Sequence, residues 1–152
     1  MSRRRAREFA LQALYEVDVS GSSAAPALRG LLAGVLEGDG VTTGRPADDD
    51  EQRFALRIVE GVCNHRDRID ALIESASTNW RLQRMPVVDR NILRLATFEL
   101  AECGDVPANV SINEAIELAK KFGDKDSRAF VNGLLDRIAA ETGRGGRHHR
   151  DG

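Results

Sequence analysis

Apolar residues along this 152-residue chain recur at the spacing of amphipathic helices. Small and apolar side chains at intervals of three and four predict a first helix over residues 3–19, ending at the Ser/Gly segment 20–23. A second, short helix is expected to begin near Pro26, because proline suits a first helical turn, and to run to Leu36. The glycines of residues 38–46 then predict a loop.

The rest of the chain repeats the helical pattern five times. Helices are expected from Asp48 to about His65, around residues 69–73, from Pro86 to near Gly104, from Ser111 to Gly123, and from Asp126 to Ala140. No segment alternates like a strand, so seven helices with short connections predict an all-α bundle. We expect one helical domain over residues 1–142 and a flexible basic tail of Gly, Arg and His over residues 143–152.

Helix ends give finer predictions. The acidic run 48–51 is expected to cap a helix start, where carboxylates face the positive end of the dipole. Ser111 and Glu114 have the spacing of a capping box, in which each side chain bonds the other's backbone N–H. Gly123 is placed to end the same helix in a left-handed conformation.

Composition narrows the class of protein. The chain has 41% hydrophobic residues, enough for one core, and lacks both a long apolar run and a leader-like start, so we expect a cytoplasmic protein. Cys63 and Cys103 stand far apart and are interpreted as reduced thiols. The formal net charge is −2, so any nucleic-acid contact must come from a local patch.

The N-terminal arginines form such a patch. A helix start carries positive partial charge, so Arg3, Arg4, Arg5 and Arg7 oppose the local field unless an anion is supplied. Backbone N–H groups of the first turn and guanidinium groups both bind phosphate, which makes phosphate the expected anion. Alternatively, these arginines belong to a frayed terminus and serve solubility alone.

One face of the same helix carries groups suited to an unpaired base. A rotation of about 100° per residue places the following residues opposite the small side chains: Arg4, Glu8, Leu11, Gln12 and Tyr15. Gln12 offers an amide for a base edge, and Tyr15 a ring for stacking. The face therefore favours single-stranded RNA as ligand.

Catalytic chemistry has no visible site. The three histidines are isolated or lie in the tail, and no glycine-rich phosphate loop, nucleophile elbow or Cys/His ligand spacing is present. We expect no enzyme activity, no metal and no cofactor.

Three motifs in fixed order then point to a known family. The first is Arg-Arg-Arg-Ala-Arg at 3–7 with Gln-Ala-Leu-Tyr at 12–15, and the second is Asp-Arg-Asn-Ile-Leu-Arg-Leu-Ala at 89–96 before Glu-Leu at 99–100. The third comprises Asp-Val-Pro at 105–107, Ile-Asn-Glu-Ala-Ile-Glu-Leu-Ala-Lys at 112–120, Phe-Gly at 122–123, and Phe-Val-Asn-Gly-Leu-Leu-Asp at 130–136. Over nearly its whole length the chain resembles the NusB family.

The resemblance implies two packed helical subdomains and a role in bacterial transcription antitermination, especially of ribosomal RNA operons. It implies binding of boxA RNA together with the ribosomal protein NusE, within a complex on RNA polymerase. By position, it also implies an RNA face made of Arg3, Arg4, Arg5, Arg7, Gln12, Tyr15, Arg94, Asp126 and Phe130. Asp89 would lie toward NusE.

Two other function classes stay open from sequence alone. One is a helical protein-interaction module, such as a homodimer, that contacts RNA only indirectly. The other is a helix-turn-helix DNA binder, although neither of the last two helices has the basic and amide groups of a recognition helix.

Overall fold

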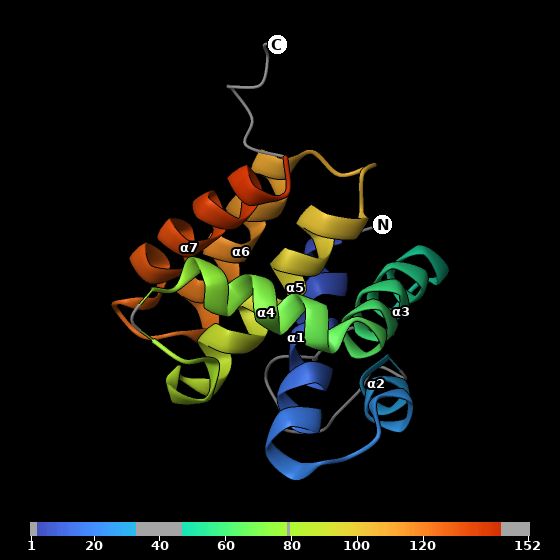
Figure 1. Cartoon of the computed structure of the whole chain (residues 1–152). Coiled ribbons are helices and arrows are strands. Elements are labelled where there is room, and N and C mark those ends of the chain that lie inside the picture. Colours follow the sequence, from blue (N-terminus) through green and yellow to red (C-terminus); the bar gives the residue numbers. More distant parts are fainter. Residues whose placement is uncertain (1–2, 33–46, 79, 144–152) are drawn as a thin grey trace. The chain divides into compact units, whose positions relative to one another are not determined.

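A computed structural model describes residues 3–32, 47–78 and 80–143 of the chain (Figure 1). Every regular element in these ranges is a helix, so the predicted all-α class is confirmed. The described chain divides into two units, residues 1–64 and 65–152, in agreement with the two helical subdomains that the family resemblance implies. The predicted 38–46 loop and the tail from residue 144 lie outside the described residues.

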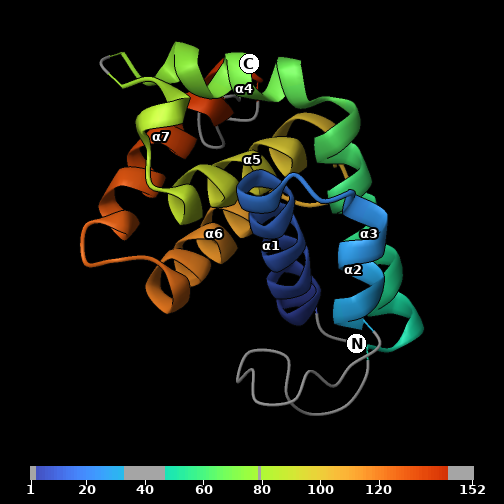
Figure 2. The same ribbon diagram turned by 90° about the horizontal axis from the view of Figure 1, so that it is seen from below.

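The first unit contains three helices: α1 (Arg3–Ser20), α2 (Ala24–Leu32) and α3 (Asp49–Asn64). Each contacts the other two, and Figure 2 shows α2 lying along α3. The core includes Phe9, Leu28 and Ile58, all nearly inaccessible to solvent. The first helix ends before Gly21, and the φ of this residue, 75°, lies in the left-handed region that glycine adopts without strain.

The start of α3 is held by a capping box. The backbone N–H of Glu51 donates to Asp48 Oδ1 at 2.8 Å, and the N–H of Asp48 donates to Glu51 Oε1 at 3.0 Å. The predicted capping by the acidic run is therefore confirmed. Asp49, Asp50 and Glu51 occupy the first turn, where the helix dipole favours negative charge.

The second unit contains α4 (Arg66–Ala76), the 3₁₀ turn η1 (Leu82–Arg84), α5 (Val87–Glu102), α6 (Ala108–Phe122) and α7 (Ser127–Glu141). α5 contacts α4, α6 and α7, and all ten residues from Asn91 to Leu100 are buried. α6 and α7 pack against each other on either side of the short connection 123–126.

Two predictions about α6 are wrong. The helix begins at Ala108 after Pro107, so Ser111 lies inside it rather than at its cap; its hydroxyl donates to Glu99 Oε1 at 2.7 Å. Gly123 has a φ of −91° and is extended rather than left-handed. Glycine is needed there because a Cβ atom would lie 2.5 Å from Ser127 Oγ.

Neither cysteine forms a disulfide: Cys63 is exposed and Cys103 is buried, as the reduced-thiol interpretation predicts. Within the described ranges, no helix has the length and apolar content needed to cross a membrane.

Candidate nucleic-acid interface

The four N-terminal arginines differ in exposure. Arg4 is exposed, Arg3 and Arg5 are partly buried, and Arg7 is only 3% exposed. The guanidinium carbon of Arg3 lies 4.2 Å from the centre of the Phe54 ring, and that of Arg7 lies 5.1 Å from it. Both cations therefore gain from the electron-rich face of an α3 aromatic ring.

Arg5 has an internal counter-ion. Its Nη1 lies 3.2 Å from Oε1 of Glu51, a fully buried carboxylate that also closes the α3 capping box. Its guanidinium carbon also lies 4.9 Å from the Phe9 ring centre. The four arginines are therefore not equivalent sites for an external anion. Arg5 and Arg7 also stabilise the unit, whereas Arg4 is the exposed member of the four.

The predicted base-contacting face of α1 is narrower than expected. Tyr15 is 42% exposed, in keeping with a ring open to stacking, but Leu11 is buried. Gln12 is partly buried, and its Oε1 has no hydrogen-bond partner among the described residues. That oxygen is buried among protein atoms, so it is an unfavourable feature of the fold rather than an open acceptor for a ligand.

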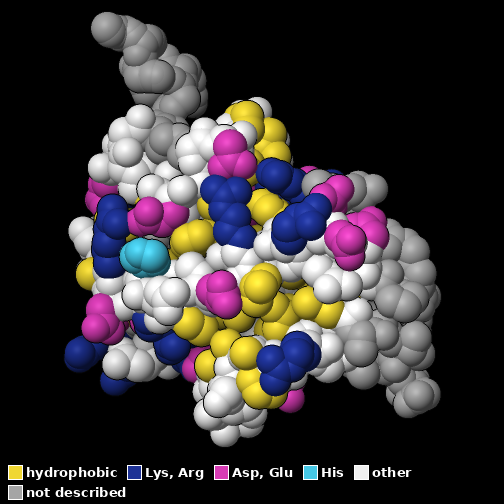
Figure 3. Space-filling model, turned by 90° about the vertical axis from the view of Figure 1, so that its right-hand side faces the viewer, with side chains coloured by type: hydrophobic (Ala, Val, Ile, Leu, Met, Phe, Trp, Pro, Cys, Tyr) yellow, Lys and Arg dark blue, Asp and Glu magenta, His cyan; other side chains and the backbone are white. Residues whose placement is uncertain are grey.

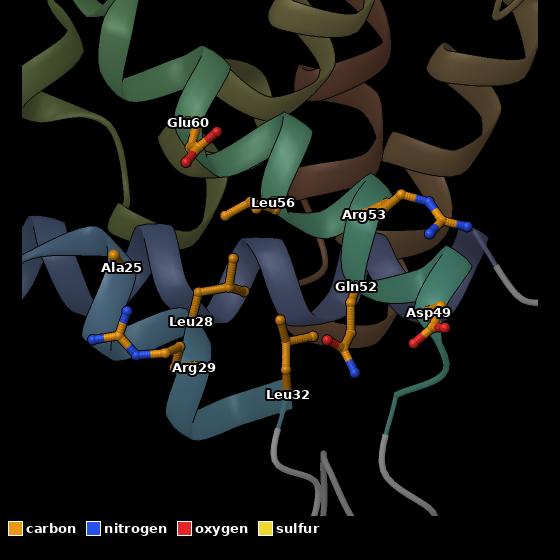
Figure 4. A pocket seen from close by; sticks show the side chains of 9 residues that line it. All are labelled: Ala25, Leu28, Arg29, Leu32, Asp49, Gln52, Arg53, Leu56 and Glu60. Carbon is orange, nitrogen blue, oxygen red and sulfur yellow. The ribbon is translucent and has the colours of Figure 1, made fainter.

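An apolar hollow of about 460 Å³ lies between α2 and α3. Figure 4 shows Leu28, Leu32 and Leu56 between the two helices, while the guanidinium end of Arg53 extends away from them. The hollow has a hydrophobic floor and a charged rim, and sequence analysis did not foresee it.

In the second unit, Arg94 is held inside the fold. It is 5% exposed; its Nε donates to Asp70 Oδ1 at 2.9 Å and its Nη2 to Asp70 Oδ2 at 3.2 Å, so the pair is bidentate. Its Nη1 donates to Asn91 Oδ1 at 3.1 Å. Arg94 thus ties α5 to α4, and Asp70 is a partner that sequence reasoning missed because the two residues are distant in the chain.

Asp89 is also buried, at 4% exposure, and accepts a hydrogen bond of 2.7 Å from Ser127 Oγ. Burial raises the pKa of the Asp89 carboxyl above its usual 3.8, the Ser127 hydrogen bond opposes that shift, and the negative charge of Asp124 adds to it. The bond joins the start of α5 to the start of α7. It fixes the turn that presents Asp126, which is exposed and whose N–H donates to Asp124 Oδ1 at 2.9 Å.

Phe130 forms an aromatic pair that the sequence did not predict. Its ring centre lies 5.1 Å from that of Trp80 in an edge-to-face arrangement, and Trp80 is 39% exposed. The Trp80 carbonyl accepts from Ser77 Oγ at 3.0 Å, and the N–H of Leu82, two residues on, donates to Glu74 Oε2 at 2.9 Å. The only signal in the sequence was that the chain's one tryptophan follows a helix end, in a connection.

The predicted site residues divide between the two units. Arg3, Arg4, Arg5, Arg7, Gln12 and Tyr15 belong to the first, and Arg94, Asp126, Phe130 and Asp89 to the second. Each unit offers an exposed aromatic ring beside polar or charged groups. Among the described residues, no three His, Cys, Asp or Glu side chains are grouped to hold a metal ion.

An arginine-rich helix start and exposed aromatic rings are features with which helical proteins can bind single-stranded nucleic acid. Comparison with known proteins makes the class specific: the model of the NusB family matches residues 4–140. The chain belongs to the NusB family, and the family resemblance seen in the sequence is confirmed.

Individual relatives agree over nearly full length. The transcription antitermination protein NusB of Myxococcus xanthus is 51% identical over 138 residues, covering 91% of this chain and 94% of that protein. The structure of T. maritima NusB aligns with a TM-score of 0.79 at 37% identity, over 93% and 92% of the two chains. A crystal structure of the antitermination factors NusB and NusE in complex with double-stranded RNA aligns with a TM-score of 0.77 at 27% identity, over 91% and 96%.

Proposed function

We propose that this protein is a transcription antitermination factor that binds boxA RNA together with NusE and so supports processive transcription of ribosomal RNA operons. Membership of a family of antitermination proteins carries this proposal. It acts as an adaptor and not as an enzyme, because it holds an RNA element and a protein partner without changing a covalent bond.

In the first unit, RNA binding begins at α1. Arg4 contacts phosphate, with Arg3 beside it, while Arg5 and Arg7 hold the helix start against α3. Tyr15, which is 42% exposed, stacks on an unpaired base, and the partly buried Gln12 side chain is the proposed contact to a base edge. The three kinds of contact together are those by which proteins bind single-stranded RNA.

In the second unit, the Trp80–Phe130 pair is the proposed stacking surface, with Asp126 nearby in the chain at the start of α7. Arg94 contributes from within by fixing α4 to α5 through Asp70. The proposed effect of Asp89 on NusE binding is likewise indirect, since its carboxylate holds the start of α7 through Ser127.

The assembly in which the protein works is proposed to be the antitermination complex on RNA polymerase, which places it in the cytoplasm. A homodimer stays an alternative state, and light scattering of the free protein and of its RNA complex decides between one chain and two.

The proposal is tested by fluorescence anisotropy with boxA RNA and a scrambled control of equal length, each with and without NusE. We expect preference for boxA, and tighter binding with NusE. Each phosphate contact with a single strand contributes about −0.7 to the slope of log affinity against log salt, so the contacts of Arg3 and Arg4 give roughly −1.4 and four contacts would give roughly −2.8.

A duplex RNA and a duplex DNA of the same sequence serve as competitors. Equal binding of boxA and scrambled RNA, with a salt slope near zero, would contradict the proposal. Equal competition by duplex DNA would favour the helix-turn-helix alternative.

A further inference from the structure

A second, smaller hollow lies within the first unit, between the start of α1 and the first half of α3. Its volume is about 160 Å³, and its lining residues are Arg3, Asp50, Arg53, Phe54 and Arg57. A water molecule occupies about 30 Å³ of liquid, so the hollow has room for a group of phosphate size. Three guanidinium groups and one carboxylate give its walls a formal charge of +2.

The sequence of α3 places these side chains together. Asp50, Arg53, Phe54 and Arg57 are spaced i, i+3, i+4 and i+7, which is one face of a helix. Phe54 is 4% exposed and forms the floor, and the Arg3 guanidinium lies 4.2 Å from its ring centre. In Figure 4, Arg53 extends away from the leucines of the larger hollow.

The electrostatics of this face favour an added anion. Arg53 and Arg57 are like charges one helical turn apart, an arrangement that disfavours the helix in isolation. Asp50 pairs with Arg53, but Arg53 is 72% exposed, so solvent screens that ion pair. Guanidinium groups match the oxygens of phosphate with two parallel N–H donors, so three of them lining one hollow suit a phosphate group. Figure 3 shows basic side chains close to acidic ones beside a hydrophobic patch on one face of the molecule.

We propose that this hollow, the α3 arginine site, binds a phosphodiester group of the RNA strand, so that the phosphate-binding surface continues from α1 onto α3. The inference rests on the proposed RNA binding and extends it to Arg53 and Arg57. It also supplies phosphate contacts in place of Arg5 and Arg7, which the fold uses internally.

The test is a salt titration of boxA RNA binding with the double variant Arg53→Gln/Arg57→Gln. At about 0.1 M salt, a slope of −0.7 per contact makes each lost phosphate contact roughly a fivefold loss of affinity, and the slope falls in magnitude by about 0.7. The Asp50→Asn variant should do the opposite and tighten binding, because it removes the only negative side chain lining the described hollow.

Arg29→Gln is the matched control. Arg29 is an exposed arginine of the same unit. It lines the larger hollow, which Arg53 also borders, but not the smaller one, so one positive charge is lost outside the site, against two in the double variant. Its variant should bind RNA like the wild type. Circular dichroism of each variant checks that its helix content equals that of the wild type.

Two outcomes separate this inference from the proposed function. If the wild type binds boxA RNA and Arg4→Gln weakens it, but the double variant matches the wild type in affinity and salt slope, the α3 arginine site is wrong and the function stands. If the wild type does not bind boxA RNA, the proposed function fails, and pyrophosphate becomes the probe. Pyrophosphate should then shift the Nε–Hε NMR resonances of Arg53 and Arg57, and no shift would overturn the site as well.

Discussion

Gly123 provides a sharp test of how the second unit is assembled. Its backbone, at φ −91° and ψ −172°, is one that any residue adopts, so alanine there is not strained by conformation. A Cβ atom would instead lie 2.5 Å from Ser127 Oγ, 2.6 Å from Ser127 Cβ and 2.9 Å from the Ala119 carbonyl oxygen. Two of these three atoms cannot rotate away, so the turn between α6 and α7 has to shift.

The shift has two energetic parts. Inserting a methyl group into a packed region costs about 1–3 kcal/mol. Moving Ser127 also weakens its hydrogen bond to the Asp89 carboxylate, and bonds to charged groups are worth about 1.5–3 kcal/mol. We expect Gly123→Ala to lower the free energy of unfolding by about 2–4 kcal/mol, allowing for partial relaxation.

The assay is thermal and urea unfolding followed by circular dichroism, and the expected fall in Tm is roughly 4–16 °C for a chain of this size. Gly133→Ala is the control. Gly133 lies within α7, and a Cβ atom added to it would meet open space, so alanine there should stabilise by about 0.5–1 kcal/mol through helix propensity. A Gly123→Ala protein as stable as the wild type would refute the reasoning.

Three further predictions concern charge and stacking. Because the pKa of Asp89 is raised above 3.8, its ionisation makes the wild type lose stability as pH rises through the interval between 3.8 and the raised value. The free energy of unfolding of Asp89→Asn, measured by urea unfolding, should therefore rise relative to that of the wild type as pH increases over that interval. A difference between the two proteins that does not change with pH would contradict this. Arg94→Met should destabilise by about 1–3 kcal/mol, because Asp70 loses its bidentate partner while keeping Arg66 and some solvent, and Asp70→Asn should suppress part of that loss. Trp80→Ala should weaken single-stranded RNA binding by about 1–3 kcal/mol and Trp80→Phe by much less, whereas equal losses from both would exclude stacking.

Helix positions followed from local information, and so were largely predicted. The intervals of three and four gave α1 and α3 to within two residues, and the acidic run at 48–51 predicted the cap of α3. The start of α6 was missed because Ser111 fits a capping box locally, whereas the helix begins at Ala108, directly after Pro107, and the Ser111 hydroxyl donates to Glu99.

The candidate site was predicted less completely, because burial depends on residues distant in sequence. On charge alone, the N-terminal arginines are equivalent candidates for binding phosphate. In the structure, however, Arg5 donates to Glu51, which is 46 positions further along the chain. Nothing near Arg94 in sequence indicated that Asp70 would enclose it. The sequence analysis did not single out Arg53 or Arg57, because the hollow that they line also needs Arg3 of α1, which is distant in sequence.

The dual role of Glu51 affects how experiments on the N-terminus are read. A truncation that removes the residues before Ala6 leaves the buried Glu51 carboxylate without Arg5. The truncated protein would therefore be less stable, in addition to lacking cationic groups. If such a deletion lowers RNA binding, the loss has two causes that the experiment does not separate: lower stability and missing contacts. Arg4 is the exposed member of the group, so a single substitution there, with the fold checked by circular dichroism, is the better test of recognition.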